Sequence, residues 1–287
     1  MAATSFYATV PEGAAADDFL ADYERFLVER NGRLDADTGF ERRDDLMADL
    51  ASLGGSYDGP LDEGVVRAGY AGRKPVDLRD EELALLSFVK INAGEAYGVE
   101  VTTTARAKLY ERDEPIFRIE KVLAHEETFH TRMLLGVTQH FGNLDLGDGW
   151  TPPFPLKVLI FALAKSPPAM FHPILLGSEI AGVFTLNWLL ERSRQLFPDH
   201  PEIRESMERR LIEILIDEIG HIAYNRIAIG QRGLRFAKPM AGQVVRGQEL
   251  MTPEVVALGL DRAEQARLDG FDYAGLPEEV RRRAFFV

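Results

Sequence analysis

The sequence predicts an all-α fold whose core is a bundle of four long helices. Four segments carry helical periodicity with few helix breakers, at about residues 80–99, 114–141, 168–195 and 202–230. Each of them contains a carboxylate set among apolar residues. The connection 141–167 is long and rich in glycine and proline, whereas the third and fourth segments are joined by a short polar turn. This pattern predicts two helical hairpins joined by one long crossover.

Local signals place the two helices of the first hairpin. The first helix follows Asp80, and acidic residues in its first turn suit the positive end of a helix. It is expected to run on to about Glu111, which leaves little chain before the second helix. The second helix follows residues 113–115, Asp-Glu-Pro, a capping acid and an early proline.

Proline and glycine mark the ends of the second hairpin. The third helix follows Pro167-Pro168, and the fourth follows residues 199–202, Asp-His-Pro-Glu. The fourth helix is expected to stop near Gly230 and Gly233, because glycine commonly ends helices.

Shorter elements are expected outside the four helices. A short apolar helix at 156–164 interrupts the long connection, and residues 15–30 and 40–53 read as helical. The Gly-, Asp- and Pro-rich segment 54–78 reads as irregular. Residues 252–254, Thr-Pro-Glu, predict a capped helix start.

Length and composition limit the classes of function. The 287 residues, 46% of them hydrophobic, predict a single domain with its core at 80–230 and with the extensions 1–79 and 231–287 packed on it. Asp and Glu, 46 in number, exceed Lys and Arg, 33, by 13, and no basic run occurs, so no nucleic-acid partner is expected. The absence of cysteine excludes disulfides, thiolate zinc sites and iron–sulfur clusters. Any metal must therefore be held by nitrogen and oxygen.

The expected location is the cytoplasm. The N-terminal residues carry little positive charge and no apolar run of signal-peptide length. The most lipid-like segment, 170–190, contains Glu179 in its middle and His172 near its start. A carboxylate at the centre of a bilayer is costly, so this segment is expected to be a buried helix of a protein with no membrane partner.

Two copies of the pattern Glu-x-x-His carry the predicted chemistry. Residues i and i+3 of a helix share a face, so Glu127 with His130, and Glu218 with His221, can each present one oxygen and one nitrogen to a metal ion. A single copy is weak evidence, since most such pairs lie on solvated helix faces. Two copies, on the second and fourth helices, are far more specific.

Single carboxylates on the other two helices complete the set. Glu95 and Glu179 each stand among apolar or small residues, where an ionised carboxylate is costly to bury unless it is paired or binds a metal. Two metal ions would compensate all four glutamates. Four carboxylates and two imidazoles suit iron or manganese.

Two further acids are expected to support the histidines. Glu126 and Asp217 each precede a motif glutamate, and metal-binding imidazoles usually donate their second N–H to a carboxylate. Both acids are placed to reach a histidine on a neighbouring helix.

The remaining polar and aromatic residues have ordinary explanations. His125 faces away from Glu127, and His172, seven residues before Glu179, either lines a pocket or packs in the core. His140 and His200 lie at helix ends and are expected to be exposed. Core positions are the default for the aromatic side chains, which are Tyr97, Phe171, Trp188 and Tyr224.

Over residues 80–230 this ligand pattern resembles the ferritin-like di-iron carboxylate superfamily, in which two helices each contribute a Glu and two others a Glu-x-x-His. The resemblance implies a ferritin-like four-helix bundle and two iron ions, with manganese as an alternative for one of them. It places the metal ligands at six positions, Glu95, Glu127, His130, Glu179, Glu218 and His221.

The resemblance also implies a function. The chain is expected to be an O₂-dependent oxygenase or oxidase that acts on a small organic substrate, receives electrons from a separate reductase or ferredoxin, and forms a homodimer as the default state. The expected substrate pocket is lined by Phe88, Leu176, Val183 and Phe184. The alternatives are a ferroxidase or iron-storage protein, and a metal-free helical interaction protein.

Marks of several subfamilies are missing. Ribonucleotide reductase small subunits have a radical tyrosine where this chain has Leu134, and arylamine N-oxygenases have an additional histidine where it has Ile214. Bacterial multicomponent hydroxylases have a threonine at the position of Val183, and rubrerythrins usually add a cysteine-ligated iron domain. The pattern that remains resembles a less familiar oxygenase branch, of which aldehyde-deformylating oxygenases are one simple relative.

Overall fold

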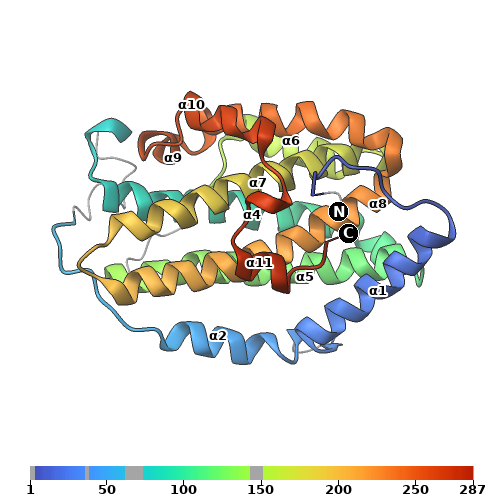
Figure 1. Ribbon diagram of the computed structural model, residues 1–287, viewed down its shortest axis with the longest axis horizontal. Helices are drawn as coiled ribbons and strands as arrows, with labels where there is room; N and C mark the ends of the chain where they lie inside the picture. Colours follow the sequence, from blue (N-terminus) through green and yellow to red (C-terminus); the bar gives the residue numbers. More distant parts are fainter. Residues whose placement is uncertain (1–3, 36–38, 62–73, 143–150, 287) are drawn as a thin grey trace.

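The computed structural model of the chain is all-α apart from one short ladder of two strands (Figure 1). The two strands, β1 (Leu34–Asp35) and β2 (Gly39–Phe40), pair antiparallel. The all-α class predicted from the sequence is confirmed. The structure describes residues 4–35, 39–61, 74–142 and 151–286.

The first hairpin consists of α4 (Asp80–Tyr110) and α5 (Pro115–Gly136). A carboxylate of Glu82 in the first turn of α4 accepts a hydrogen bond from the backbone N–H of Arg79 at 3.1 Å, which caps the helix. The predicted extension of this helix to about residue 111 is confirmed. The second helix becomes a 3-10 helix, η3 (Val137–Phe141), within its predicted range.

The second hairpin consists of α7 (Pro168–Leu196) and α8 (Pro201–Met251). The predicted end of the fourth helix near Gly230 is confirmed, because the backbone of Gly230 is non-helical, but a second helical stretch of α8, which was not predicted, follows this break and continues to Met251. Gly230 has a φ of 61°, a left-handed conformation that glycine adopts without steric cost, so the chain changes direction and helical structure resumes.

The part of α8 after Gly230 is held by packing against α7. A Cβ atom added to Gly177 of α7 would lie 2.6 Å from the Cβ of Met240 and 2.9 Å from the carbonyl oxygen of Ala237. Ala237 and Ala241 are completely buried. Small residues thus allow the two helices to approach closely, and this tertiary contact holds the helical stretch after Gly230 against α7.

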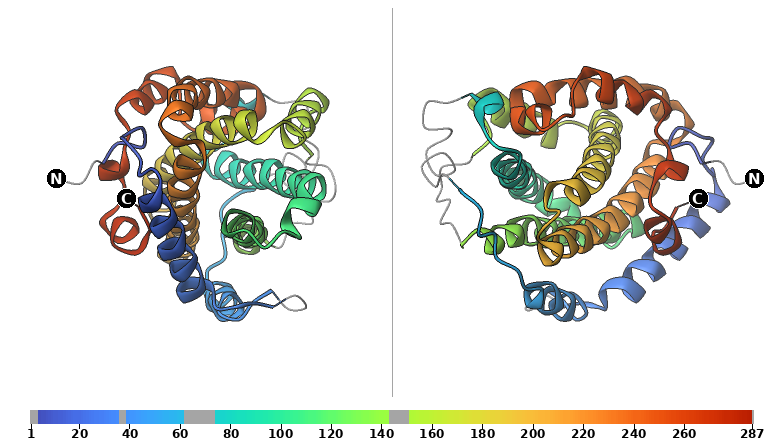
Figure 2. Two further views of the ribbon diagram at one scale, coloured as in Figure 1. Left: turned by 90° about the vertical axis from the view of Figure 1, so that its right-hand side faces the viewer. Right: turned by 60° about the vertical axis from the view of Figure 1, so that its left-hand side comes forward.

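The four long helices lie side by side, with α4 and α5 forming one pair and α7 and α8 the other (Figures 1 and 2). Helix α5 also contacts α8, and α4 contacts α7. The crossover between the hairpins contains α6 (Phe154–Ala164), which packs on α4 and α7 and was predicted at 156–164. Apolar side chains of all four long helices meet in one core cluster.

The extensions pack on these helices. In the N-terminal extension, α1 (Ala14–Asn31) and α2 (Arg43–Ser52) both contact α5 and α8, as expected for residues 15–30 and 40–53. Part of the segment predicted to be irregular, 62–73, lies outside the described residues. The remaining short elements are η2 (Pro75–Asp77), α9 (Pro253–Ala257), α10 (Arg262–Gln265), η5 (Ala266–Gly270), η6 (Tyr273–Gly275) and α11 (Glu278–Arg283).

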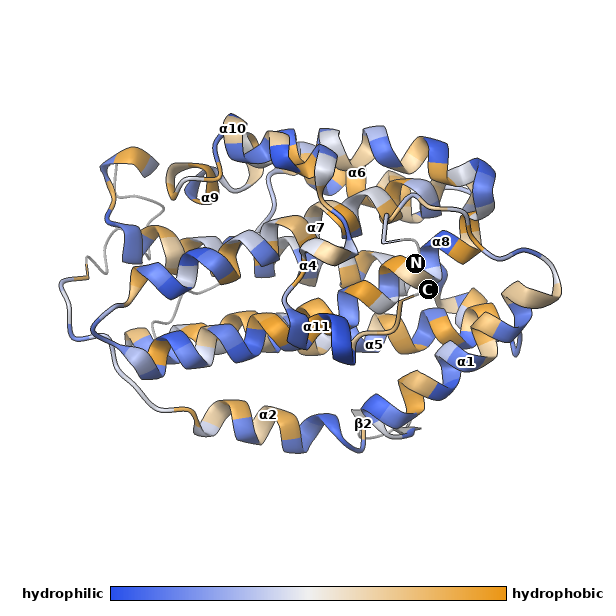
Figure 3. Cartoon of the chain, in the orientation of Figure 1, coloured by the Kyte–Doolittle hydropathy of each residue, from blue (hydrophilic) through white to orange (hydrophobic). Residues whose placement is uncertain are grey.

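Helix α7 is long and apolar enough to cross a membrane by length and composition. Within the protein, however, 61% of its most apolar window is buried. Most of this apolar window is therefore covered by other parts of the same chain, and Figure 3 shows the hydropathy of α7 and the elements around it.

Candidate metal centre

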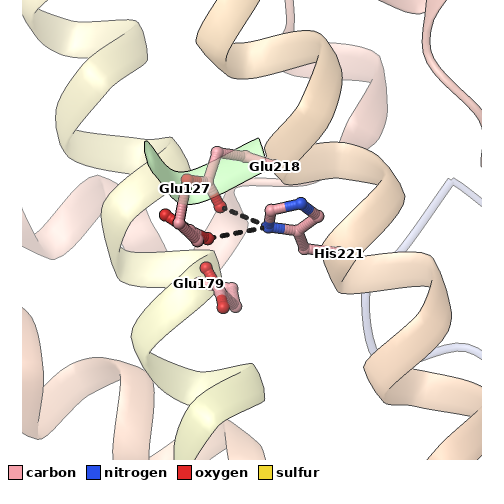
Figure 4. A group of neighbouring side chains, drawn as sticks. All are labelled: Glu127, Glu179, Glu218 and His221. Atoms are coloured by element: carbon pink, nitrogen blue, oxygen red, sulfur yellow. Dashed lines mark ion pairs between the residues drawn. The ribbon is translucent and has the colours of Figure 1, made fainter. Parts of the chain in front are cut away.

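Four of the six predicted ligands converge at the centre of the bundle (Figure 4). They are Glu127 on α5, Glu179 on α7, and Glu218 and His221 on α8, and one ligand atom from each lies within 4.8 Å of all the others. The cluster forms because each ligand stands on the inward stripe of its helix. Glu218, for example, lies one turn from Ile214 and Ile222, which are both completely buried.

The two histidines stand on either side of the same two carboxylates. The Nδ1 atom of His221 lies 3.1 Å from Glu127 and 3.6 Å from Glu218. The Nδ1 atom of His130 lies 3.2 Å from each of these carboxylates. The imidazole rings are 5.7 Å apart. Glu127 and Glu218 are therefore both in reach of both imidazoles.

Glu95 joins this group electrostatically, although it is not one of the four residues within 4.8 Å. Burial raises the pKa of Glu95 well above its usual range, and the neighbouring carboxylate of Glu127 raises it further. Its Oε2 atom is buried and has no hydrogen-bond partner among the described residues. Burial, followed by the carboxylate of Glu218, likewise raises the pKa of Glu179.

The two acids that precede the motif glutamates contact the histidines of the opposite helix. Glu126 on α5 lies 3.1 Å from the Nε2 atom of His221, and Asp217 on α8 lies 3.1 Å from the Nε2 atom of His130. A histidine that donates Nε2–H to an ionised acid keeps the lone pair of Nδ1 free, facing the glutamates. This pair of contacts orients both rings and links α5 to α8.

Two arginines of the N-terminal extension neutralise these acids, and sequence reasoning missed both. The Nη2 atom of Arg43 lies 2.8 Å from each carboxylate oxygen of Asp217 and 3.1 Å from Glu126, and Arg43 is 1% exposed. Arg30 forms a second ion pair with Asp217. Burial by itself would raise the pKa of Asp217, but Arg30 and Arg43 hold it well below its usual range.

Asn31 forms hydrogen bonds with both Arg43 and Glu126. It donates to Glu126 at 2.7 Å and accepts from the Nε atom of Arg43 at 2.6 Å. Helices α1 and α2 thus supply part of the surroundings of the site. Nothing in the local sequence distinguishes Arg43 from its exposed neighbour Arg42, so no signal could have singled it out.

Arginines pair with the outer carboxylates, Glu126 and Asp217, but not with the inner ones that face the Nδ1 atoms of the histidines. Glu126 and Asp217 are compensated by Arg30 and Arg43, and Glu213, the other acid beside Arg30, pairs also with Arg283. No arginine or lysine of the described residues forms an ion pair with the four inner glutamates, which are Glu95, Glu127, Glu179 and Glu218.

Two divalent cations would compensate the four inner carboxylates, and the available atoms fit that role. The Nδ1 atom of His130 and one oxygen each of Glu95 and Glu218 are buried without a hydrogen-bond partner among the described residues. Burial would lower the pKa of both His130 and His221, but the surrounding carboxylates raise it well above its usual range. The site thus attracts positive charge, which metal ions can supply by displacing protons.

Family models, curated proteins and solved structures give no match to this chain. Its function must therefore be inferred from the arrangement of its own residues.

A second buried polar layer lies about two helical turns, or roughly 10 Å, along the bundle from the site. Arg106 and Glu120 pair at 2.8 Å, and His172 lies 3.4 Å from Glu120 and 3.1 Å from the side-chain oxygen of Asn225. Asn225 donates to the backbone carbonyl of His221 at 3.0 Å, which connects this layer to the site. His172 is therefore a buried, hydrogen-bonded core residue, one of the two alternatives considered from the sequence.

The predicted pocket residues all belong to the main apolar core. Phe88, Leu176, Val183 and Phe184 are at most 5% exposed, and the ring of Phe184 packs edge-on against Phe271 of the C-terminal extension. A cavity of about 520 Å³ lies elsewhere, between α1 and the connection from α4 to α5, and none of the six candidate ligands lines it.

The prediction that His140 is exposed is wrong. His140 is 1% exposed and lies 2.7 Å from the hydroxyl of Ser206 and 2.9 Å from the carbonyl oxygen of Gly55. The segment after α2 covers it, a contact that the position of a residue near a helix end does not reveal. The side chain of His200 is 23% exposed, and His125 contacts the carbonyl oxygen of Lys121, away from the site.

Proposed function

We propose that this chain is a ferritin-like non-haem di-iron oxygenase or oxidase, which activates O₂ to oxidise a small organic substrate. The connectivity supports the ferritin-like assignment, because α4–α5 and α7–α8 are hairpins joined by a crossover that contains α6. The observation that carries the proposal is the set of four carboxylates and two imidazoles on the inward faces of the four helices, whose carboxylates pair with no arginine or lysine among the described residues.

The six residues would share two metal ions. Glu127 and Glu218 lie near the Nδ1 atoms of both histidines, and with Glu95 and Glu179 they would supply the carboxylates that hold the ions. Iron held by carboxylates and imidazoles supplies the redox chemistry with O₂, and manganese could replace one iron. Glu126 and Asp217 would hold the histidine rings in the orientation that presents Nδ1.

The proposal also includes an electron donor, a location and an oligomeric state. Electrons would come from an external reductase or ferredoxin, because a chain without cysteine holds no iron–sulfur cluster of its own. A cytoplasmic location and a homodimer remain part of the proposal. The contribution of α1 and α2 to the site favours an enzyme over a storage protein, since a minimal storage bundle requires no such extension.

Iron binding tests the proposal. Purified protein loaded anaerobically with Fe(II) is expected to retain two iron ions per chain, and His130→Ala is expected to lower metal affinity by more than tenfold. His125→Ala is the matched control, because His125 stands on the same helix but points away from the site. Optical spectra of the reduced protein exposed to O₂, with and without candidate substrates, then test the oxidation.

The outcomes separate the alternatives. Fewer than one iron per chain, or equal losses in both variants, would refute the metal centre. Many more than two irons per chain in a large assembly would establish iron storage instead, and O₂ consumption that no organic substrate changes would point to a ferroxidase.

A further inference from the structure

Helix α6 exposes an apolar face that no other part of the chain described by the structure covers. Its inward residues Leu156, Ile160 and Leu163 are half-buried, consistent with the packing of α6 on α4 and α7. Its outward residues are also apolar. The exposed fractions are 77% for Phe154, 51% for Val158, 64% for Leu159 and 47% for Phe161, with 59% for Met170 at the start of α7.

The charges beside this face are positive in an otherwise acidic chain. Residues 151–178 contain no Asp or Glu, and their charged side chains are Lys157 and Lys165, whereas the whole chain carries a net charge of −13. The Nζ atom of Lys165 lies 4.1 Å from the ring centre of Phe161, and that of Lys157 lies 5.5 Å from the ring centre of Tyr97. Lys165 is therefore exposed next to an aromatic ring of the apolar face, and Lys157 lies at the flank of this face, next to Tyr97 of α4.

We propose that α6 docks on the surface of an anionic lipid bilayer. The apolar face and the two lysines, together called the α6 surface, consist of Phe154, Lys157, Val158, Leu159, Phe161, Lys165 and Met170. The apolar side chains would enter the boundary between headgroups and acyl chains, and the lysines would contact anionic headgroups. The exposed apolar side chains and the two lysines thus provide both kinds of contact that hold a peripheral helix at an anionic surface.

The size and charge of the α6 surface argue against a second copy of the chain as its partner. A stable protein interface buries roughly 800 Å² on each partner, whereas these five apolar side chains present a patch on the order of a few hundred Å². A symmetric contact would also bring the lysines of the two copies together, and residues 151–178 contain no acid to compensate them. A lipid surface requires neither a larger area nor an acidic partner residue.

Docking of α6 is a peripheral contact and not a span. The helix has 11 residues, which cover roughly 17 Å, about half the thickness of the hydrocarbon core. This inference departs from the sequence-based expectation of no membrane partner, which rested on Glu179 in the middle of α7. The inference is also independent of the metal centre, so either can fail without the other.

Vesicle binding tests the inference with the full-length protein. The protein is expected to co-sediment with vesicles of phosphatidylcholine and phosphatidylserine, and at least tenfold less with vesicles of phosphatidylcholine alone. Lys157→Glu/Lys165→Glu should lower binding to the mixed vesicles by more than tenfold, since each basic residue contributes roughly a fivefold factor near an anionic surface. Phe154→Ser/Leu159→Ser should lower it at least as much, because these two side chains carry much of the exposed apolar area.

Matched variants control for net charge and for general surface polarity. Lys108→Glu/Lys121→Glu makes the same change in charge at exposed positions on α4 and α5, and Val28→Ser removes a half-exposed apolar side chain from α1. Both should bind the mixed vesicles as the unaltered protein does. Far-UV circular dichroism of every variant verifies that the fold is retained.

Three results would overturn the inference. The first is no binding of the unaltered protein to the mixed vesicles, and the second is an equal loss in the control variant Lys108→Glu/Lys121→Glu. The third is a dimer, seen by analytical ultracentrifugation, that Phe154→Ser/Leu159→Ser dissociates while vesicle binding stays unchanged, because the α6 surface would then be a contact between copies.

Discussion

Replacing Arg43 by methionine should destabilise the metal-free protein by about 3 kcal/mol. Arg43 is 1% exposed and places its guanidinium against Asp217 and Glu126. Removing one partner of a buried ion pair costs about 3–5 kcal/mol, because the other charge stays buried. Asp217 keeps Arg30 in the variant, which places the expected cost at the lower end of that range.

Urea unfolding, followed by far-UV circular dichroism after treatment with a chelator, measures this cost. Arg42→Met is the matched control, because Arg42 is the exposed neighbour in the sequence, and substitutions of this kind change stability by at most about 0.5 kcal/mol. Arg43→Lys keeps the positive charge but loses the planar guanidinium, so its free energy of unfolding should lie between those of Arg43→Met and Arg42→Met.

The same variant should weaken metal binding. The guanidinium of Arg43 holds the two acids that orient His130 and His221, and loss of such outer contacts typically lowers metal affinity by about 10–100-fold. If Arg43→Met and Arg42→Met were to unfold within about 0.5 kcal/mol of each other, the argument that Arg43 neutralises a buried pair of carboxylates would be wrong.

Two further predictions concern the rest of the bundle. Burial would raise the pKa of Glu120, but the neighbouring imidazole and guanidinium lower it, so its stabilising effect is present above the pKa of the unfolded chain and is lost as the pH falls through the folded-state pKa. Glu120→Gln should therefore cost about 3 kcal/mol at pH 7, and urea unfolding should show this difference shrinking below about pH 4; a constant difference would refute the assignment. Gly177→Val should lower stability by about 1–3 kcal/mol because its side chain would collide with Met240 on α8, and an unchanged melting temperature would contradict the close contact of α7 with the end of α8.

Helical periodicity was sufficient to predict the four long helices and the residues on their inward faces. The spacing of Glu127 and His130 is a local property of any α-helix, and so is that of Glu218 and His221. The two Glu-x-x-His motifs come together when the inward faces of the second and fourth helices meet. The apolar residues around Glu95 in the sequence likewise predict that it lies on the inward face of its helix.

Other features depended on contacts between distant parts of the chain. The break of the fourth helix at Gly230 follows from the sequence, but the second helical stretch beyond it, which packs on Gly177, does not. His140 was expected to be exposed, and the segment at Gly55 buries it. A residue's own neighbours in the sequence contain no information about a segment that covers it from elsewhere.

The sequence by itself determined the helices, their inward faces and the set of six candidate ligands, because these follow from a repeat of 3.6 residues and from the cost of burying a carboxylate. Only the tertiary structure decided how that set is supported. Arg43 lies 83 positions from Glu126 and 174 from Asp217 along the chain, and it reaches both because α2 packs on α5 and α8. Contacts of this kind depend on how separately formed helices fit together, and no local pattern encodes that fit.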